Sequence, residues 1–259
     1  MQLPDKFIER IKFDLKEEAD QFFSSLNLDI PVSIRINTDK GYDTEGLEKV
    51  LWSDTGFYLK QRPVFTLDPL FHAGSYYVQE ASSMFLEQVL KQSVDLSQPL
   101  KVLDLCAAPG GKSTHLCSLL SNDSLLVSNE VIRHRSKILS ENLIKWGNSN
   151  VVVTNNDPSS FQKLKGFFDV LVVDAPCSGE GLFRKDSDAV NEWSEDNVNL
   201  CSARQKRIIN DVWEALKPGG IVIYSTCTYN EQENEENIKW MTEEMGAEPL
   251  KINIDDYPQ

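Results

Sequence analysis

The chain has few cysteines, and none of them stands in a paired arrangement. There are five in 259 residues, an odd number, and no Cys-x-x-Cys spacing occurs. This usage argues against a disulfide framework or a zinc site and fits a reducing, cytoplasmic environment. The three histidines, His72, His115 and His134, are scattered and form neither a metal-binding nor a triad pattern. We therefore expect no metal.

Long hydrophobic runs are also missing. No apolar stretch approaches the length of a membrane span, and the first residues carry no signal-peptide pattern. Hydrophobic residues make up 41% of the chain and charged residues 25%, as in ordinary globular proteins. We expect a monomer without membrane association, large enough for one large domain or two.

Positive charge is in short supply. Lys and Arg number 26 against 40 Asp and Glu, which gives a net charge of −14. This balance speaks against nucleic acid at first sight, because phosphates favour basic surfaces. The charge is uneven, however: residues 230–259 hold nine acidic and two basic side chains, while basic residues cluster at 133–137 and 204–207. Those clusters can equally be solvated helix faces, so charge alone does not decide the partner.

The first part of the chain has the pattern of a small α+β domain. Apolar residues at helical spacing predict a helix over residues 4–26, and alternation predicts a strand over 31–37. A short helix is expected over 44–50. The stretch 69–74 is a plausible junction. These features predict an N-terminal α+β domain of residues 1–70 and a second domain of residues 71–259.

Residues 71–259 alternate between strand and helix patterns. Apolar, β-branched runs bounded by Gly and Pro predict buried strands, and helical periodicity predicts the helices between them. This order is typical of a parallel sheet with right-handed crossovers, so we expect a Rossmann-like α/β fold. The expected strands are residues 101–105, 125–129, 150–154, 168–174, 220–225 and 249–254, and the expected helices are 79–91, 112–121, 131–146, 197–216 and 230–245.

A glycine-containing loop follows the first of these strands. It lacks the Gly-x-Gly-x-x-Gly pattern, but its glycines let the backbone approach a ligand, and the amides of the next helix together with Lys112 favour a carboxylate. Glu130 closes the second strand and suits a ribose diol, and Asp157 closes the third and suits an adenine amine. Each acid alone reads as a cap or turn residue. Together they fit S-adenosylmethionine at least as well as NAD. The loop residues are Cys106, Ala107, Ala108, Pro109, Gly110, Gly111 and Lys112.

Each of two later strands is followed closely by a cysteine, Cys177 after one and Cys227 after the other. That edge of an open α/β sheet is where such folds bind ligands. A lone cysteine is usually a small buried hydrophobe, which is our expectation for Cys117 and Cys201. Two thiols beside a cofactor loop instead indicate covalent chemistry. A thiolate that adds to carbon 6 of a pyrimidine makes carbon 5 nucleophilic enough to accept a methyl group, and Asp174 is placed to hold the nitrogen edge of the ring.

Several motifs together resemble the Nol/Nop/Sun family of RNA cytosine-5 methyltransferases, and are most similar to its bacterial RsmF-type enzymes of small-subunit ribosomal RNA. The similarity covers roughly residues 30–240. Residues 33–37 and 76–80 also look like family landmarks. The motifs that carry the resemblance are Cys106–Lys112, Asp174–Gly181, Lys217–Gly220 and Tyr224–Tyr229.

The resemblance implies a role for each site residue. Cys227 would be the nucleophile, Cys177 would assist release of the methylated product, and Asp174 would contact the cytosine. Lys185 would contact the RNA or the base, and the base would be flipped out of its stack. S-adenosylmethionine would be the cofactor and ribosomal RNA the partner. The residues lining the cofactor site would be the loop 106–112, Glu130, Arg135, Asp157 and Asp174.

Family members of this type continue with a further strand and an RNA-binding domain. We therefore expect a C-terminally shortened form with weakened RNA affinity. Two alternatives stay open: a non-catalytic RNA-binding or ribosome-assembly factor, and a methyltransferase for the amino group of adenine. Retention of both thiols and Asp174 favours the cytosine-5 methyltransferase over the non-catalytic factor, and the lack of a Pro-Pro-aromatic turn after Asp174 argues against the adenine enzyme.

Overall fold

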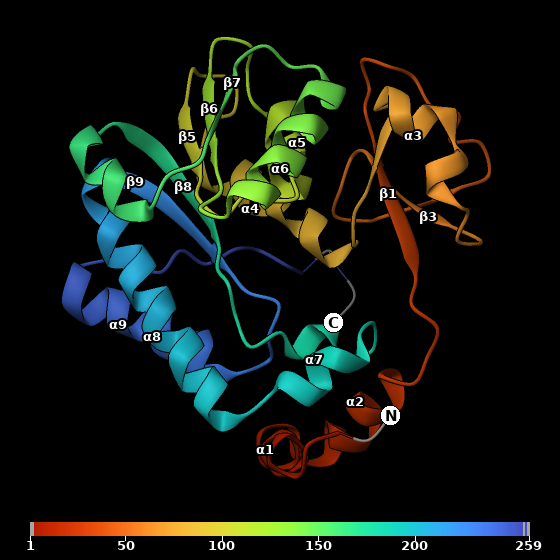
Figure 1. Ribbon diagram of the computed structural model, residues 1–259, viewed down its shortest axis with the longest axis vertical. Coiled ribbons are helices and arrows are strands. Elements are labelled where there is room, and N and C mark those ends of the chain that lie inside the picture. The colour runs from red at the N-terminus through yellow and green to blue at the C-terminus, as the bar shows by residue number, and fades with distance from the viewer. Residues whose placement is uncertain (1–2, 256, 258–259) are drawn as a thin grey trace. The chain divides into compact units, whose positions relative to one another are not determined.

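Within residues 3–255 and 257, which the computed structural model describes, the larger of two sheets has five strands in the order β7-β6-β5-β8-β9 (Figure 1). The central strand β5 pairs in parallel with β6 and β8, and β6 pairs in parallel with β7. Backbone bonds from Phe167 N to Ala215 O and from Ala175 N to Ser225 O advance in the same direction, so β9 is parallel too. The strands are β5 (Lys101–Asp104), β6 (Leu125–Asn129), β7 (Val151–Thr154), β8 (Phe168–Asp174) and β9 (Leu216–Ser225).

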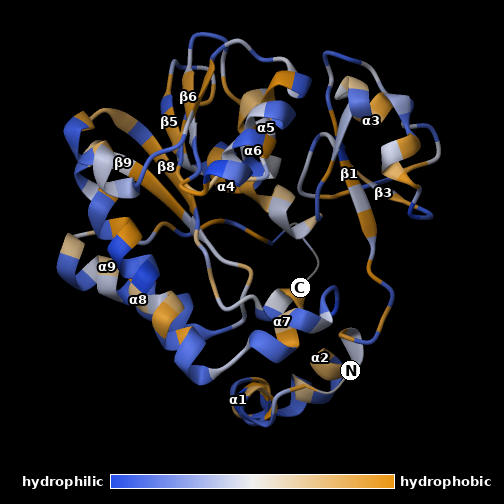
Figure 2. Ribbon diagram, in the orientation of Figure 1, coloured by the Kyte–Doolittle hydropathy of each residue, from blue (hydrophilic) through white to orange (hydrophobic). Residues whose placement is uncertain are grey.

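Strand β8 shows why these segments become buried strands. Its run of β-branched and aromatic residues suits a strand packed on both faces, and Val170, Val172 and Val173 are 0% exposed. The hydropathy colouring of Figure 2 shows the same strand as largely hydrophobic. The expected parallel sheet and Rossmann-like fold class are therefore confirmed.

Three helices cover one face of this sheet and pack into its core. Figure 1 shows them between the large sheet and the strands of a smaller one. Leu90, Leu116 and Leu139, one from each helix, are fully buried in the cluster that also contains Val102 and Val170. The helices are α4 (Leu86–Ser93), α5 (Gly111–Leu119) and α6 (Arg133–Trp146).

The smaller sheet is antiparallel, in the order β2-β3-β1-β4. The helix expected over residues 44–50 is wrong, because a turn with Gly46 at φ +71° leads into a two-residue strand paired with β3. The helix α3 (Pro69–Ala73) precedes β4. That last strand pairs with β1, so the small sheet continues past residue 70. Its strands are β1 (Val32–Ile36), β2 (Glu48–Lys49), β3 (Gly56–Leu59) and β4 (Tyr76–Val78).

The chain divides into two compact units. The larger holds both sheets and consists of residues 31–174, 209–224 and 250–259. The smaller consists of residues 1–30, 175–208 and 225–249. The two units draw on segments on both sides of residue 70, and the domain division expected there remains a prediction.

The smaller unit is helical. Phe7 is fully buried against Phe183 and Trp193, with ring centroids 5.0 and 6.1 Å away. The helix expected over residues 4–26 is interrupted at Lys16, whose φ of +50° a regular helix does not allow. The helices are α1 (Asp5–Leu15), α2 (Ala19–Ser25), α7 (Ser187–Glu192), α8 (Glu195–Val212), which the unit boundary crosses, and α9 (Glu235–Met245).

The strand expected over residues 249–254 is also wrong. This segment lies in neither helix nor strand. Asn253 instead bonds through its backbone N and O to the side-chain amide of Gln92, at 2.7 and 3.1 Å. Those backbone groups are therefore satisfied without a neighbouring strand.

Two helices and the small sheet meet around a buried carboxylate, Glu87 of α4. It accepts hydrogen bonds from Ser53 Oγ at 2.8 Å, from Lys91 Nζ at 2.6 Å and from the backbone N of Asp54. His115 Nε2 of α5 lies 3.1 Å from Glu87, and its Nδ1 has no partner among the described residues. Burial alone would raise the pKa of Glu87, but these hydrogen bonds hold it well below its usual range. Glu87 is therefore ionised and His115 neutral, with its proton on Nε2.

This neutral histidine predicts a loss of stability in mild acid. Burial lowers the pKa of His115 from 6.5 to about 4, so the unfolded chain binds a proton there that the folded chain refuses. The free energy of unfolding should therefore fall as the pH drops from 6.5 towards 4, by at most about 1.4 kcal/mol per pH unit from this residue. Urea unfolding of His115→Gln across this range should show a shallower slope. The exposed His134→Gln should keep the slope of the unsubstituted chain, and an unchanged slope in His115→Gln would contradict the assignment.

Candidate active site

The loop after β5 turns directly into α5 and lines a cavity of about 190 Å³. Gly110 has a φ of +114°, which side chains rarely adopt, and a Cβ at Gly111 would lie 3.4 Å from the Tyr77 ring. The first amides of α5 have no partners within the helix. At this cavity, the backbone of the loop and the first amides of α5 can therefore approach a ligand. The expected loop residues other than Gly110 all line this cavity, together with Tyr77, Val78, Gln79, Glu80, Ser83 and Asp174.

Charged side chains surround the loop as the sequence predicts. Lys112 Nζ pairs with Asp174 Oδ2 at 2.7 Å. Glu130 is 2% exposed at the end of β6 and accepts a hydrogen bond from Ile132 N at 2.9 Å. Arg135 contacts Glu130 at 3.4 Å and donates to Ala108 O of the loop at 2.7 Å. The loop, the acid and the arginine thus form one connected group.

Asp157 stands apart from this group. It is exposed and caps the short 3-10 helix Pro158–Leu164, where its Oδ1 accepts the backbone N of Ser159 at 3.1 Å. It does not line the cavity of the loop. Its expected role toward an adenine amine therefore remains a prediction.

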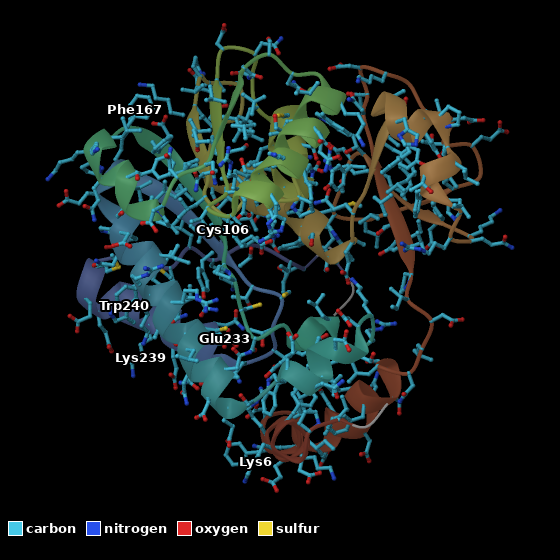
Figure 3. All side chains as sticks on the ribbon, in the orientation of Figure 1. Lys6, Cys106, Phe167, Glu233, Lys239 and Trp240 are labelled. Carbon is cyan, nitrogen blue, oxygen red and sulfur yellow. The ribbon has the colours of Figure 1, made fainter. Side chains whose placement is uncertain are left out.

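A half-buried thiol and a buried carboxylate accompany the loop. Burial raises the pKa of the Cys106 thiol to about 12, so this sulfur, labelled in Figure 3, remains protonated. Asp104, the last residue of β5, was missed by sequence analysis. Its Oδ2 accepts from Ser113 Oγ at 2.6 Å, its Oδ1 has no partner among the described residues, and burial raises its pKa to about 7. A carboxylate inside an apolar strand run was the available signal.

The two expected thiols lie together in the smaller unit. Cys177 Sγ is 3.1 Å from Cys227 Sγ and accepts a hydrogen bond from the backbone N of Cys227 at 3.3 Å. Cys227 is exposed and Cys177 is half-buried. The hydrogen bond with Cys227 and burial hold the pKa of Cys177 above its usual range. The contact with the second sulfur and burial thus disfavour the thiolate form of Cys177.

A buried glutamate from the first thiol loop holds the second. Glu180 is 0% exposed and accepts two hydrogen bonds from Arg10 NH2, both at 2.7 Å. It also accepts the backbone N of Tyr229 at 3.2 Å and Trp193 Nε1 at 3.0 Å. Next to it, Gly181 N donates to Cys227 O at 2.8 Å.

A second buried glutamate, which follows the second thiol loop, holds the first. Glu233, labelled in Figure 3, follows the Cys227 loop and accepts the backbone N and the Oγ of Ser178, at 3.0 and 2.5 Å. Gln205 Nε2 also donates to Glu233 at 2.8 Å. Each thiol loop is thus held by a carboxylate that belongs to the other loop or follows it. Sequence analysis missed both glutamates, which there look like ordinary polar loop residues.

Three other residues complete the account of the expected sites. Lys185 is exposed in the turn before α7, in the same unit as the thiols. Cys117 and Cys201 are buried. Among the described residues, no group of three or more His, Cys, Asp or Glu is arranged to hold a metal ion, and no helix there is long and apolar enough to cross a membrane.

Comparison with known proteins agrees with this geometry. The family described as 16S rRNA methyltransferase RsmB/F matches residues 92–256, and the N-terminal domain of 16S rRNA methyltransferase RsmF matches residues 3–81. The ribosomal RNA small subunit methyltransferase F of Aeromonas hydrophila is 36% identical, over 95% of this chain and 55% of that protein. The chain spans about half the length of the curated relatives it matches.

Solved structures agree on the fold. A methyltransferase homologue from Pyrococcus horikoshii is 30% identical, with a TM-score of 0.72 over 88% of this chain and 74% of its own. NSun6 from the same organism is 20% identical, with a TM-score of 0.76 over 92% of this chain and 86% of its own.

The parallel sheet, the glycine loop that opens α5 and the acid that closes β6 define a Rossmann-like fold of the methyltransferase class. Within that class, the chain belongs to the RsmB/F family of 16S ribosomal RNA methyltransferases. The expected family resemblance is therefore confirmed.

The hydrogen bonds that Glu180 accepts predict that its substitution has a large effect on stability. Glu180→Ala removes the acceptor from Arg10 and from the Tyr229 amide, and breaking such a buried pair costs about 3 kcal/mol or more. Urea unfolding should show this loss in the free energy of unfolding. The matched control is Glu9→Ala, which removes an exposed glutamate paired with Lys6 on α1 and should leave stability unchanged within error. Equal effects of the two substitutions would show that Glu180 does not hold the thiol loops.

Proposed function

We propose that this chain transfers a methyl group from S-adenosylmethionine to carbon 5 of a cytosine in 16S ribosomal RNA, through a covalent cysteine adduct. The observation that carries the proposal is the 3.1 Å approach of two thiols, Cys177 and Cys227, on loops that leave neighbouring strands of the sheet. Family membership supports the substrate class and the cofactor.

The chain connects the first thiol loop directly to Asp174, the ion-pair partner of the glycine loop. Cys177 follows Asp174 by three residues, and three residues of extended chain span at most about 11 Å. Asp174 in turn pairs with Lys112 of the glycine loop. In the proposed enzyme the thiols and the cofactor loop therefore serve the same substrate.

The two thiols differ in the way the reaction requires. Cys227 is exposed and supplies the attacking thiolate, while Cys177 keeps its proton because its pKa is raised. The Cys227 sulfur forms a bond to carbon 6 of the ring, and carbon 5 becomes nucleophilic. S-adenosylmethionine supplies the methyl group as an electrophile. A base then takes the carbon 5 proton, the electron pair of that C–H bond re-forms the ring double bond, and the Cys227 sulfur leaves as a thiolate. We assign the base to Cys177, after it has given its own proton to solvent, or to a water that it orders.

The remaining residues bind and orient. The loop residues 106–112 and Glu130 fit the cofactor, because helix amides suit its carboxylate and a buried acid suits its ribose. Arg135 holds the loop through Ala108 O. Asp174 is proposed to face the cytosine edge, Asp157 the adenine amine, and Lys185 the RNA. The monomeric state and the absence of a metal remain predictions.

The different roles of the two thiols can be separated on a gel. Incubated with S-adenosylmethionine and a 16S ribosomal RNA transcript, Cys177→Ala should accumulate a covalent protein–RNA adduct, because attack proceeds and release fails. Cys227→Ala should give neither adduct nor methyl transfer, while still binding the cofactor. Denaturing electrophoresis and transfer of labelled methyl groups measure the two outcomes.

The matched control is Cys201→Ala, which changes a buried cysteine. It should behave like the unsubstituted chain in both measurements. An adduct in Cys227→Ala and none in Cys177→Ala would reverse the roles of the two thiols. If the unsubstituted chain transfers no methyl group and Cys177→Ala forms no adduct, the proposed function is contradicted for this chain.

A further inference from the structure

Gln79 presents an unsatisfied donor to the cavity of the glycine loop. It directly follows β4 and is 6% exposed. Its Nε2 is buried and has no hydrogen-bond partner among the residues described by the structure. Gln79 lines the same cavity as the loop, with Nε2 3.8 Å from the position of a Cβ on Gly111. A buried donor without an acceptor costs free energy unless a ligand supplies one.

The orientation of this amide is set by its neighbours. Arg35 Nε donates to Gln79 Oε1 at 2.8 Å, and because a guanidinium only donates, the amide cannot be reversed without opposing two donors. The backbone is held by Ser33, which accepts Gln79 N at 3.2 Å and donates to Gln79 O through Oγ at 2.6 Å. Ser33 and Arg35 are two apart on β1 and therefore share one face of that strand. Nε2 is accordingly the end of the amide turned away from Arg35 Nε, and it lies beside Gly111 of the cavity lining.

Arg35 brings a buried positive charge to the start of α5. It is 0% exposed and, within the described part of the chain, no carboxylate lies within ion-pair distance of it. Its NH2 donates to Thr114 Oγ1 at 2.5 Å, and its guanidinium lies 4.5 Å from the Trp146 ring centroid. A cation at a helix N-terminus is unfavourable by itself, because that end already carries partial positive charge. An anion in the cavity would relieve it.

The other cationic side chain at the cavity is already engaged. Lys112 Nζ pairs with Asp174 Oδ2 at 2.7 Å. Gln79 Nε2, whose amide is bonded to Arg35, and the first amides of α5 can therefore donate to an anion together with the N–H groups of Lys112 that do not face Asp174. Among the groups of S-adenosylmethionine, only the carboxylate of its methionine part is anionic.

We propose that Gln79 is a cofactor-binding residue whose Nε2 donates to the carboxylate of S-adenosylmethionine, and that Arg35 is the positioning residue that orients its amide. This inference rests on the proposed function, because it takes the cofactor from there. It gives a physical role to residues 33–37 and 76–80, which the motif analysis marked without assigning them one.

The test compares S-adenosylmethionine with its decarboxylated form, which lacks only the proposed acceptor. Calorimetry on the unsubstituted chain should show tighter binding of the carboxylated ligand. Gln79→Glu keeps an acceptor for Arg35, removes the donor and turns a negative charge toward the carboxylate. It should lose about tenfold to a hundredfold in affinity for S-adenosylmethionine, and change less than threefold toward the decarboxylated form.

The exposed Gln98→Glu adds the same charge elsewhere and should leave both affinities unchanged. If urea unfolding shows that Gln79→Glu is poorly folded, Gln79→Ala takes its place. Gln79→Ala should still lower the affinity for S-adenosylmethionine relative to the affinity for the decarboxylated form. Equal loss for both ligands would make Gln79 structural only, and no loss for either ligand would place the carboxylate elsewhere; either result overturns the inference. Failure of the unsubstituted chain to bind S-adenosylmethionine at all would instead contradict the proposed function.

Discussion

The pairing of the two thiols depends on buried carboxylates that satisfy backbone amides. Where a strand releases the chain into a loop, its amides lose their ladder partners and must find others. Glu180 takes the amide of Tyr229, and Glu233 takes that of Ser178. Each loop is thereby fixed by an acceptor from the other side, and the 3.1 Å distance between the sulfurs follows from this mutual fixing. Arg10 and Gln205 in turn make the two buried charges tolerable.

The larger unit also holds a buried charge, but there the charge is positive. Arg35 is buried with no carboxylate partner among the described residues, and it is satisfied by neutral acceptors on α5 and by Gln79. Desolvation lowers its pKa to about 9, which still leaves it charged at neutral pH. A buried charge held in this way is costly, and it ties the small antiparallel sheet to the first turn after the glycine loop. The small sheet therefore contributes to the shape of the cofactor cavity and is more than an appendage to it.

Sequence reasoning located the elements whose signal is local. The runs that form β5, β6 and β8 are continuous and β-branched, and they were predicted within a residue. β2 was mistaken for a helix because two residues carry no periodicity, and only pairing with β3 makes them a strand. Residues 249–254 alternate like a strand, yet the amide of Gln92 satisfies Asn253 and leaves that residue no need of a neighbouring strand. Non-local partners decided both cases.

The same distinction applies to the site. Cys177, Cys227 and the loop 106–112 could be found because strand ends and glycines mark them. Glu180 and Glu233 could not, because their importance lies in burial, which depends on residues distant in the sequence, whereas Asp104 was overlooked although a carboxylate in an apolar strand run marked it. Asp157 caps a 3-10 helix, so its local signal serves a structural role as well as the one predicted for it, and that predicted role stays a prediction.

The geometry of the thiol pair has a consequence for how the two sulfurs divide their tasks. Two thiolates 3.1 Å apart would repel each other by about 5 kcal/mol at an effective dielectric constant near 20. Only one sulfur can therefore carry the charge at a time, and the other must keep its proton or be bonded. The exposed sulfur is Cys227, and the raised pKa belongs to Cys177. Once Cys227 is bonded to carbon, its negative charge is gone, and of the two causes that raise the pKa of Cys177 the contact with Cys227 is weakened while burial remains. Formation of the adduct would thus itself make Cys177 more acidic and ready it for the release step.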